Sequence, residues 1–420
     1  MFVYKFGGAS IADAERMSNL LPIIADGQKP LLLVVSALGK TTNALENIVN
    51  KAFHGDAAEA LAHAHKLEQQ HLYFAEKLLS AGNYINAAEV LKVYFNELEN
   101  AVKNIAPGNY DYSYDQVVCL GEIFSTILFY FFLRQHNLPI EWIDIRTVIR
   151  TDATYRDAAV DWEYSKQQAQ DIIGSELHKG KIVITQGFIG ATSAGKSVTL
   201  GREGSDYTAA ILAAMLHASS VTIWKDVEGL QNADPKQFPN TVKIDAISYN
   251  EVIEMAFYGA QIIHPKTIKP LQNNNIPLYV KCFLDPKLDG SVIQAKVHAA
   301  YPPLIVLKEN QVLIQVTTKD FSFITEDNLS KLYSIFHDLN VKINLIQNAA
   351  ISFVACIDNR EDKVKSLIEA LGKDYKVSIN DHVSLLTIRH YTPEIIGNLI
   401  KDTQILLRQE TRKTVQVIMK

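Results

Sequence analysis

The chain has 420 residues, of which 48% are hydrophobic and 21% charged, and its formal net charge is −5 at pH 7. This length allows two to three domains, and the composition is ordinary for a globular protein. The slight negative charge provides no basic field, so nucleic acid is not expected as a partner. The three cysteines are far apart and form no C-x-x-C pair, which favours a reducing compartment over a disulfide framework or zinc knuckle.

The N-terminal sequence MFVYKFGG enters an apolar run at once, without the basic region and apolar core of a secretion signal. The most apolar run, Ile127–Leu133, is far shorter than the roughly 20 residues that a membrane-spanning helix needs. We therefore expect a cytoplasmic protein without a membrane partner.

Short, continuous apolar runs alternate with helical patterns up to about residue 296. Strands buried on both faces have this character, so the predicted fold class is α/β with a mainly parallel sheet covered by helices. A mostly helical insert is expected at about residues 42–106. The predicted strands are Phe2–Phe6, Leu31–Ser36, Lys181–Ile189, Ser220–Trp224 and Leu278–Phe283.

Three histidines of the insert, His63, His65 and His71, raise the question of a metal site. Their spacings of two and six residues do not place ligands on one face of a helix, where a spacing of four is wanted. We therefore expect a solvated amphipathic face, not a metal site.

The pattern changes after a proline-containing joint at His298–Leu304. Residues 311–379 have the order βαββαβ, which is typical of a ferredoxin-like α+β domain. A partial second copy runs from Val383 to Met419 and is short of strands. Leu304–Leu307 is a candidate to complete it across the joint.

The segment GATSAGKS at residues 190–197 matches the phosphate-loop pattern letter for letter. A phosphate loop needs a helix directly after it, because the N–H groups of that helix face the phosphates. Here VTLG follows, and no helix is expected before Asp206. We interpret the segment as a glycine-rich hairpin turn between Val183–Ile189 and Val198–Leu200.

The segment TLGREGSDYTAA at residues 199–210 precedes an apolar helix that we expect to begin near Asp206, with Ser205 as its N-cap. Free N–H groups at a helix start attract anions, and the planar fork of Arg202 suits a carboxylate or phosphate. A capped helix after a tight turn would explain the same glycines and serine, although not the arginine. Both interpretations stay open on this segment alone.

The segment KFGGAS at residues 5–10 is predicted to end a strand and open a helix. Two glycines at such a turn, with Lys5 as a point charge beside them, would form a second anion site. A plain tight turn between strand and helix remains the alternative.

Taken together, these segments resemble the aspartokinases of the amino-acid kinase superfamily, in consistent order from Met1 to about Val292. The tail resembles the paired ACT regulatory domains of the same enzymes. The resemblance implies an amino-acid kinase catalytic domain at 1–297 and two ACT-like domains at 303–420. The segments that carry it are KFGGAS, SALGKTTN (36–43), GEIFST (121–126), QGFIG to GREGSDYTA (186–209), WKDVEGLQNADPK (224–236) and AFYGAQIIHPKTIKP (256–270).

The family reaction transfers the γ-phosphoryl group of ATP to the β-carboxylate of L-aspartate, which gives 4-phospho-L-aspartate and opens lysine, threonine and methionine biosynthesis. A carboxylate is already ionised at neutral pH, so no general base is required. The chemical problem is to hold two anions together. The alternatives are a kinase for glutamate, acetylglutamate or UMP, and a non-catalytic ACT-containing ligand sensor.

The resemblance also assigns roles to individual residues. Lys5 would stabilise charge on the transferring phosphoryl group, Arg202 would clamp the substrate α-carboxylate, and Asp206 would contact its ammonium group or order Lys5. Mg²⁺ would bridge the β- and γ-phosphates of ATP, without a dedicated protein metal site. Substrate contacts are expected from Ser36, Thr42, Glu122 and Arg202, and ATP contacts from Lys5, Gly7, Gly8, Trp224, Lys225, Asp226, Gln231, Lys236 and Gln261.

The chain departs from the family pattern at five of its positions. The loss of a tyrosine at Gln231 removes a stacking face for adenine. Glu203 stands in the turn around Arg202 (residues 199–204, called the arginine turn below), where the family usually has glycine. The other departures are Lys225 for threonine, Lys236 for arginine and Gln261 for lysine.

Regulation is open at the level of sequence. Lysine-inhibited relatives bind their effector through an aspartate, a serine and a glutamate, and the matching residues here are Asn344, Ala349 and Ala350. Lysine, another amino-acid effector, or a plain dimerisation role all remain. ACT domains pair through their sheets, which implies a homodimer or larger assembly. Since the chain ends at Lys420, a fused homoserine dehydrogenase is not expected.

Overall fold

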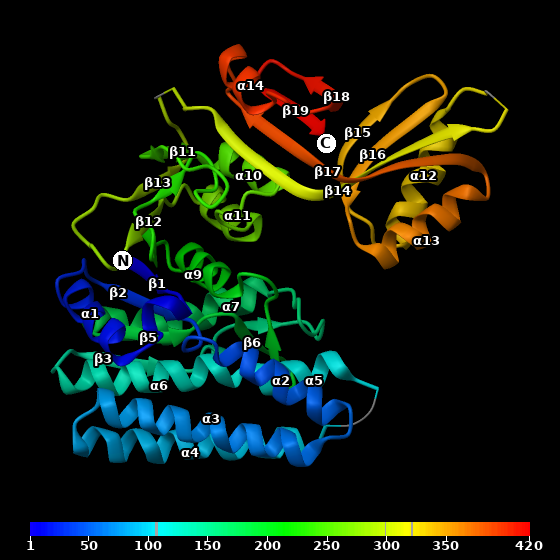
Figure 1. The fold of residues 1–420 in the computed structure, drawn as a ribbon. Coiled ribbons are helices and arrows are strands. Elements are labelled where there is room, and N and C mark those ends of the chain that lie inside the picture. The colour runs from blue at the N-terminus through cyan, green and yellow to red at the C-terminus, as the bar shows by residue number, and fades with distance from the viewer. Residues whose placement is uncertain (106–107, 299, 321) are drawn as a thin grey trace. The chain divides into compact units, whose positions relative to one another are not determined.

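The computed structural model describes residues 1–105, 108–298, 300–320 and 322–420 (Figure 1). The chain forms two compact units. The first contains Met1–Leu230, Asp245–Ile253 and Ile262–Ala299, and the second contains Gln231–Ile244, Glu254–Gln261 and Ala300–Lys420. The expected end of the helical insert at Ala106 and the joint residue Ala299 lie outside the described residues.

An eight-stranded sheet in the order β11-β13-β12-β8-β1-β2-β5-β3 organises the first unit. Its centre is β1 (Phe2–Phe6), which pairs in parallel with β2 (Leu31–Val35) and β8 (Ser220–Lys225). Only the β12–β13 pair of this described sheet is antiparallel, so the predicted mainly parallel α/β fold is confirmed. The remaining strands are β3 (Ile140–Ile143), β5 (Ile182–Gln186), β11 (Ala246–Ser248), β12 (Leu278–Cys282) and β13 (Ser291–Gln294).

Helices cover the sheet and form the predicted insert. Figure 1 shows α3 and α4 of the insert packed in a layer beside α6. The insert comprises α2 (Thr41–Phe53), α3 (Ala57–Leu78) and α4 (Ala81–Lys103), followed by α5 (Tyr110–Val118) and α6 (Leu120–Gln135). The others are α1 (Ala14–Ala25), α7 (Trp162–Gln168) with a π-helical continuation (Ala169–Gly174), α8 (Ser175–His178), α9 (Gly204–Met215), α10 (Tyr249–Tyr258) and α11 (Pro265–Asn273).

The stretch Tyr110–Gln135 is long and apolar enough, by length and composition, to cross a membrane. The prediction from the shorter run Ile127–Leu133 underestimated it, because α5 and α6 follow each other almost without a break. The most apolar window of this stretch is 89% buried inside the protein. This stretch is therefore part of the core, and helices of the insert pack onto its second helix, α6.

The prediction that the histidines of the insert lie on one solvated face was wrong. His63 and His65 are partly exposed beside glutamates, but His71 is buried between the rings of Phe95 and Phe124. Burial lowers the pKa of His71 to about 4, so this side chain is a neutral part of the core.

The phosphate-loop-like segment is a hairpin, as predicted. β6 (Ile189–Thr192) and β7 (Ser197–Thr199) pair antiparallel, and β4 (Arg150–Thr151) completes a three-stranded sheet. The strands are shorter than expected, because β5 ends at Gln186 and a turn separates it from β6.

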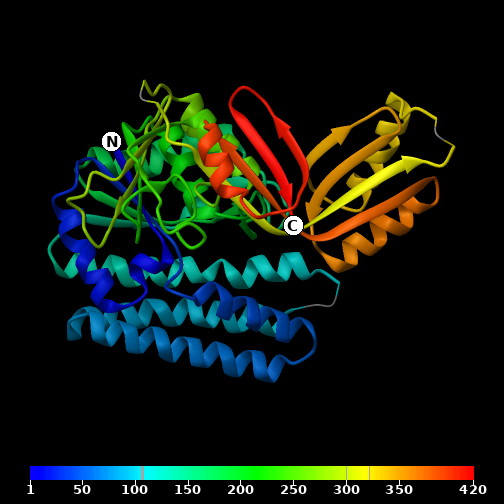
Figure 2. The same ribbon diagram turned by 45° about the horizontal axis from the view of Figure 1, so that its top comes forward.

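The second unit contains a six-stranded antiparallel sheet in the order β15-β16-β14-β17-β19-β18. The predicted βαββαβ segment supplies the first four strands of this order. Its helices α12 and α13 pack on one face of them (Figure 2). Leu304 pairs with Arg389 and Leu307 with Leu386, so the start of β14 completes the second copy, as predicted. The elements are β14 (Leu304–Thr318), α12 (Glu326–Asp338), β15 (Ile343–Asn348), β16 (Ser352–Asp358), α13 (Glu361–Gly372), β17 (Tyr375–Arg389), α14 (Pro393–Leu399), β18 (Ile405–Glu410) and β19 (Thr414–Met419).

Candidate active site

Lys5 and Asp206 meet at the carboxyl ends of the central strands. Lys5 is the fourth residue of β1 and is only 9% exposed, and its Nζ lies 2.6 Å from Oδ1 of the buried Asp206. Asp206 is in the first turn of α9. Because ligands of parallel α/β sheets bind at the carboxyl edge, this ion pair marks the expected place for a substrate. Two turns about 200 residues apart in the sequence are thus brought together.

The Gly7–Gly8 turn is built more tightly than the sequence predicted. It continues into a 3₁₀ turn (Gly8–Ile11), and α1 begins only at Ala14 with Asp13 as its N-cap. The turn therefore opens a short 3₁₀ segment, and the expectation that it opens the helix containing Met17 was wrong. The free amides of the turn are those of a 3₁₀ segment, held by bonds from the N–H (3.0 Å) and hydroxyl (2.7 Å) of Ser10 to the carbonyl of Gly7.

The two glycines of this turn differ in what surrounds them. A Cβ on Gly8 would lie 2.8 Å from the carbonyl oxygen of Ala37 and 3.0 Å from that of Gly39. A Cβ on Gly7 would meet only the Nζ of Lys5, at 3.4 Å. Gly8 therefore allows two backbone segments to approach closely, a role that no larger residue can take without a shift of the chain.

Glu122 lies in the first turn of α6 and is 3% exposed. Its Oε1 accepts a hydrogen bond from the Ala37 N–H (3.3 Å), whereas its Oε2 is buried and has no hydrogen-bond partner among the described residues. Burial raises the pKa of Glu122 to about 8, although the positive charge of Lys5 acts in the opposite direction. A buried, half-satisfied carboxyl group of this kind is typical of a binding site for a charged ligand.

Ser36 and Thr42 lie on either side of the Ala37–Gly39 turn. Ser36 directly follows β2 and is half-buried, and its carbonyl accepts a bond from the Ser125 hydroxyl (2.7 Å) of α6. Thr42 is half-buried in the first turn of α2. Hydrogen bonds thus join α6 to both residues: the Ser125 hydroxyl donates to Ser36, and the Ala37 N–H donates to Glu122.

The arginine turn differs from its prediction in one respect. α9 begins at Gly204 with Glu203 at the N-cap position, so Ser205 lies inside the helix and does not cap it. Ser205 packs against the backbone of Gly187, where a Cβ would lie 2.5 Å from the Ser205 Cβ, so position 187 has no space for a side chain. Arg202 is exposed immediately before the helix, where its guanidinium group is available to an anion.

Asp115 is a residue of this region that sequence reasoning missed. Its carboxylate accepts bonds from the Thr199 hydroxyl (2.7 Å), the Thr199 N–H (2.9 Å) and the Arg156 N–H (2.9 Å). Burial raises its pKa to about 6. Asp115 therefore fixes the start of the arginine turn, and its distance of 84 residues from Thr199 left no signal in the sequence.

The residues expected to bind the nucleotide are divided between the two units. Trp224 is buried beside the rings of Tyr4 and Phe6, and Lys225 donates from Nζ to the carbonyl of Ile262 (3.2 Å). The other expected nucleotide residues of this segment, Asp226 in the first unit and Gln231, Lys236 and Gln261 in the second, are exposed or half-buried, and their nucleotide contacts stay predictions.

The described residues include no group of three or more His, Cys, Asp or Glu side chains that could hold a metal ion. Near the Lys5–Asp206 pair, Asp206 is already paired and Glu122 is largely protonated at neutral pH. A cation that acts here would therefore be carried mainly by phosphate groups.

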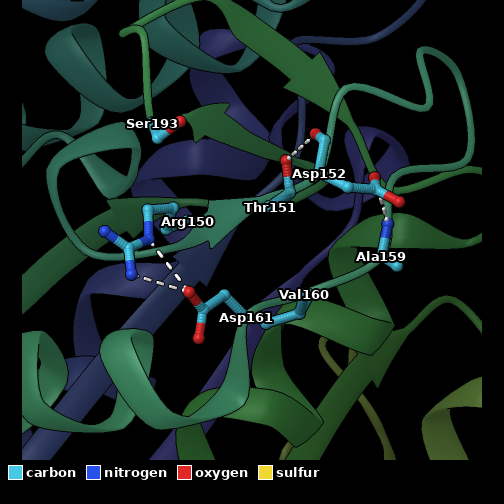
Figure 3. Close-up of a pocket in the computed structure, with 7 residues that line it drawn as sticks. All are labelled: Arg150, Thr151, Asp152, Ala159, Val160, Asp161 and Ser193. Atoms are coloured by element: carbon cyan, nitrogen blue, oxygen red, sulfur yellow. Dashed lines mark hydrogen bonds and ion pairs between the residues drawn. The ribbon is translucent and has the colours of Figure 1, made fainter.

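A separate cavity of about 520 Å³ lies beside the three-stranded sheet and contains none of the predicted site residues (Figure 3). Arg150 and Asp161 face each other in it, with 2.7 Å between Nη2 and Oδ2, and the guanidinium group also stacks on Tyr164 at 3.5 Å. Its cation and carboxylate neutralise each other, so this cavity does not have the excess positive charge that a phosphoryl-transfer site needs.

The model of the amino acid kinase family matches residues 1–282. The lysine-sensitive aspartokinase 3 of Escherichia coli is 31% identical over 403 residues, which are 92% of this chain and 86% of that protein. The chain belongs to the aspartokinase family. The crystal structure of E. coli aspartokinase III in complex with aspartate and ADP matches this aspartokinase with a TM-score of 0.82 and 28% identity, over 100% of this chain and 96% of that one.

Other aspartokinases extend the comparison. The lysine and aspartate complex of the same E. coli enzyme, described as its T-state, gives a TM-score of 0.81 at 27% identity, over 100% of this chain and 95% of that one. A chloroplastic bifunctional aspartokinase/homoserine dehydrogenase of Arabidopsis thaliana is 29% identical over 90% of this chain, which spans 42% of that protein.

Proposed function

We propose that this aspartokinase transfers the γ-phosphoryl group of ATP to the β-carboxylate of L-aspartate. The observation that carries the proposal is the convergence of Lys5, Asp206 and Glu122 at the carboxyl edge of the sheet. Support comes from the relative whose structure contains aspartate and ADP and matches the chain over its whole length.

In this reaction a β-carboxylate oxygen of aspartate attacks the γ-phosphorus, and the bond between that phosphorus and the β,γ-bridging oxygen breaks. ADP leaves with the electron pair, and no proton has to be removed from the nucleophile. Catalysis then consists of positioning and charge stabilisation. Lys5 supplies positive charge at the transferring group, and its ion pair with Asp206 fixes the direction of the ammonium group.

The other residues hold the two reactants. The amides of the Gly7–Gly8 turn donate to the phosphates, and Arg202 pairs with the α-carboxylate of aspartate. Glu122 in its ionised form accepts the α-ammonium group, for which its free Oε2 is available. Mg²⁺ carried by the nucleotide would neutralise part of the charge that develops on its phosphates.

The second unit, which contains the ACT-like domains, favours an effector other than lysine. The Asn344 amide donates to Asp358 (2.8 Å) and Gln311 (2.7 Å), and its Oδ1 accepts from the Nζ of Lys308 (2.9 Å). Asn344 stands where the resemblance places a carboxylate in lysine-inhibited relatives, and the ammonium group of Lys308 already lies against it. A second cation there would be repelled by Lys308, which already pairs with Asp358. We also propose that the ACT-like units pair to form a homodimer.

The test offers ATP, Mg²⁺ and hydroxylamine with aspartate or glutamate, and measures the acyl phosphate trapped as hydroxamate. Product with aspartate only supports the proposal. Product with glutamate only would assign another amino-acid kinase, and no product with any acceptor would assign a ligand sensor. Lys5→Ala should lower kcat about 100-fold or more, with the fold checked by circular dichroism. An unchanged kcat would refute the role of Lys5.

A further inference from the structure

Glu203 adopts a backbone conformation that favours glycine. Its φ is +54°, in the left-handed region, and it immediately follows Arg202. A side chain other than asparagine or aspartate is uncommon there and needs contacts that hold it in place. The aspartokinase pattern has glycine at this position, so the glutamate is a feature of this chain.

The side chain of Glu203 explains how this conformation is held. Its Oε2 accepts a hydrogen bond of 2.9 Å from the backbone N–H of His264, which is the N-cap of α11. The carboxylate therefore lies at a helix N-terminus, where the helix dipole favours negative charge. Because His264 is the N-cap residue, its backbone N–H has no partner within the helix, and the glutamate satisfies this donor.

The residue on the other side of Arg202 lies close to a side chain that pairs with the same helix. Gly201 has φ +79°, and a Cβ there would lie 2.5 Å from Oδ1 of Asp157. This Asp157 carboxylate forms an ion pair with Lys266, in the first turn of α11. Glu203 is thus bonded to the start of α11, and Gly201 packs closely against a carboxylate that pairs with the same helix.

We propose that Glu203 is a positioning residue for aspartate binding: it fastens the arginine turn to α11 and so holds Arg202 ready for the substrate α-carboxylate. The inference rests on the proposed function of Arg202 as the carboxylate clamp. Arg202 is exposed and has a long, flexible side chain, so fixing its backbone lowers the entropy lost on binding. The effect belongs in the KM for aspartate, and kcat and the KM for ATP should change little.

The test compares Glu203→Gly, Glu203→Gln and Arg202→Ala, alone and as the double variant Arg202→Ala/Glu203→Gly. Glycine suits the left-handed conformation, so Glu203→Gly should fold while it loses the bond to His264. We expect its KM for aspartate to rise about tenfold, with kcat and the KM for ATP within about twofold. Glu203→Gln keeps an acceptor oxygen and should stay within about threefold of the wild type. In the Arg202→Ala background, Glu203→Gly should have no further effect.

Asp402 provides the matched control. It is also an exposed acidic residue with positive φ (+61°), but it lies in the second unit and has no assigned role. Asp402→Gly should leave the KM for aspartate unchanged. The thermal shift produced by aspartate alone, measured without turnover, should be reduced in Glu203→Gly and retained in Asp402→Gly.

The outcomes separate the two proposals. If Glu203→Gly keeps the wild-type KM for aspartate, or raises it equally with and without Arg202, the positioning role is wrong while the kinase assignment stands. If the wild type yields no aspartate-dependent product, the proposed function fails first.

Discussion

The protonation state of Glu122 should control aspartate binding near neutral pH. Its pKa of about 8 in the substrate-free protein leaves roughly nine in ten molecules protonated at pH 7. The ammonium group of aspartate needs the ionised carboxylate, since a protonated one has no charge to pair with it. Binding must therefore release the proton of Glu122, and this release becomes easier as pH rises.

The size of the effect follows from the pKa. If only the ionised form binds, the apparent KM for aspartate is proportional to 1 + 10^(pKa − pH). This factor is about 100 at pH 6, about 11 at pH 7 and about 2 at pH 8. The KM should thus fall about ninefold from pH 6 to pH 7 and about fivefold from pH 7 to pH 8, and then level off.

The assay measures KM for aspartate at saturating ATP and Mg²⁺ between about pH 6 and pH 9, with ADP release as the signal. Glu122→Gln is the matched variant, because it keeps the size of the side chain and cannot ionise. We expect its KM to be higher at pH 8 and to lose the dependence on pH. A flat profile in the wild type, or an unchanged profile in Glu122→Gln, would refute the role of Glu122.

The same raised pKa has a consequence for stability. The folded protein keeps a proton on Glu122 that the unfolded chain releases above about pH 4.5, so stability falls as pH rises from there to about pH 8. The full loss is at most several kcal/mol. The free energy of unfolding of Glu122→Gln should lack this component, and bound aspartate should offset it in the wild type.

Three further predictions concern other sites. Gly8→Ala should destabilise the protein by about 1–3 kcal/mol and sharply raise the KM for ATP, because its Cβ has no space, whereas Gly7→Ala should fold normally. The stability that neutral His71 provides is complete above about pH 6.5 and is lost as pH falls towards 4, so His71→Leu should flatten this acid-side decrease in the melting temperature. Millimolar lysine should not inhibit the enzyme, and Lys308→Ala with Asn344→Asp should create sensitivity.

Each of these has an outcome that contradicts it. Equal melting temperatures for Gly8→Ala and Gly7→Ala would show that the turn adapts. An unchanged acid profile in His71→Leu would place the sensitive group elsewhere. Inhibition of the wild type by lysine, measured in the same ADP assay, would show that Lys308 does not exclude a cationic effector.

Local patterns predicted the elements of this protein well. Continuous apolar runs marked the central strands, and the turn after β6 was separated from a true phosphate loop because β-branched residues follow it. The start of β14 was assigned to the second ACT-like copy from the shortage of strands there. These inferences succeeded because strand burial, turn chemistry and strand number depend on neighbouring residues or on counting along the chain.

Predictions that needed an environment were less accurate. His71 was placed on a solvated face, but the aromatic rings of α4 and α6 bury it. Ser205 was expected to cap α9, but the helix begins at Gly204 with Glu203 at the N-cap position, and the Glu203 side chain binds the start of α11. In both cases the deciding partner is distant in sequence.

The sequence by itself determined the fold class and the family, since periodicity and short motifs are local. Only the tertiary structure decided that Lys5 is paired with Asp206, that Glu122 is buried with an unsatisfied oxygen, and that Asp115 and Glu203 support the arginine turn. The physical reason is that ion pairing and desolvation depend on distances through space, which residue order does not specify.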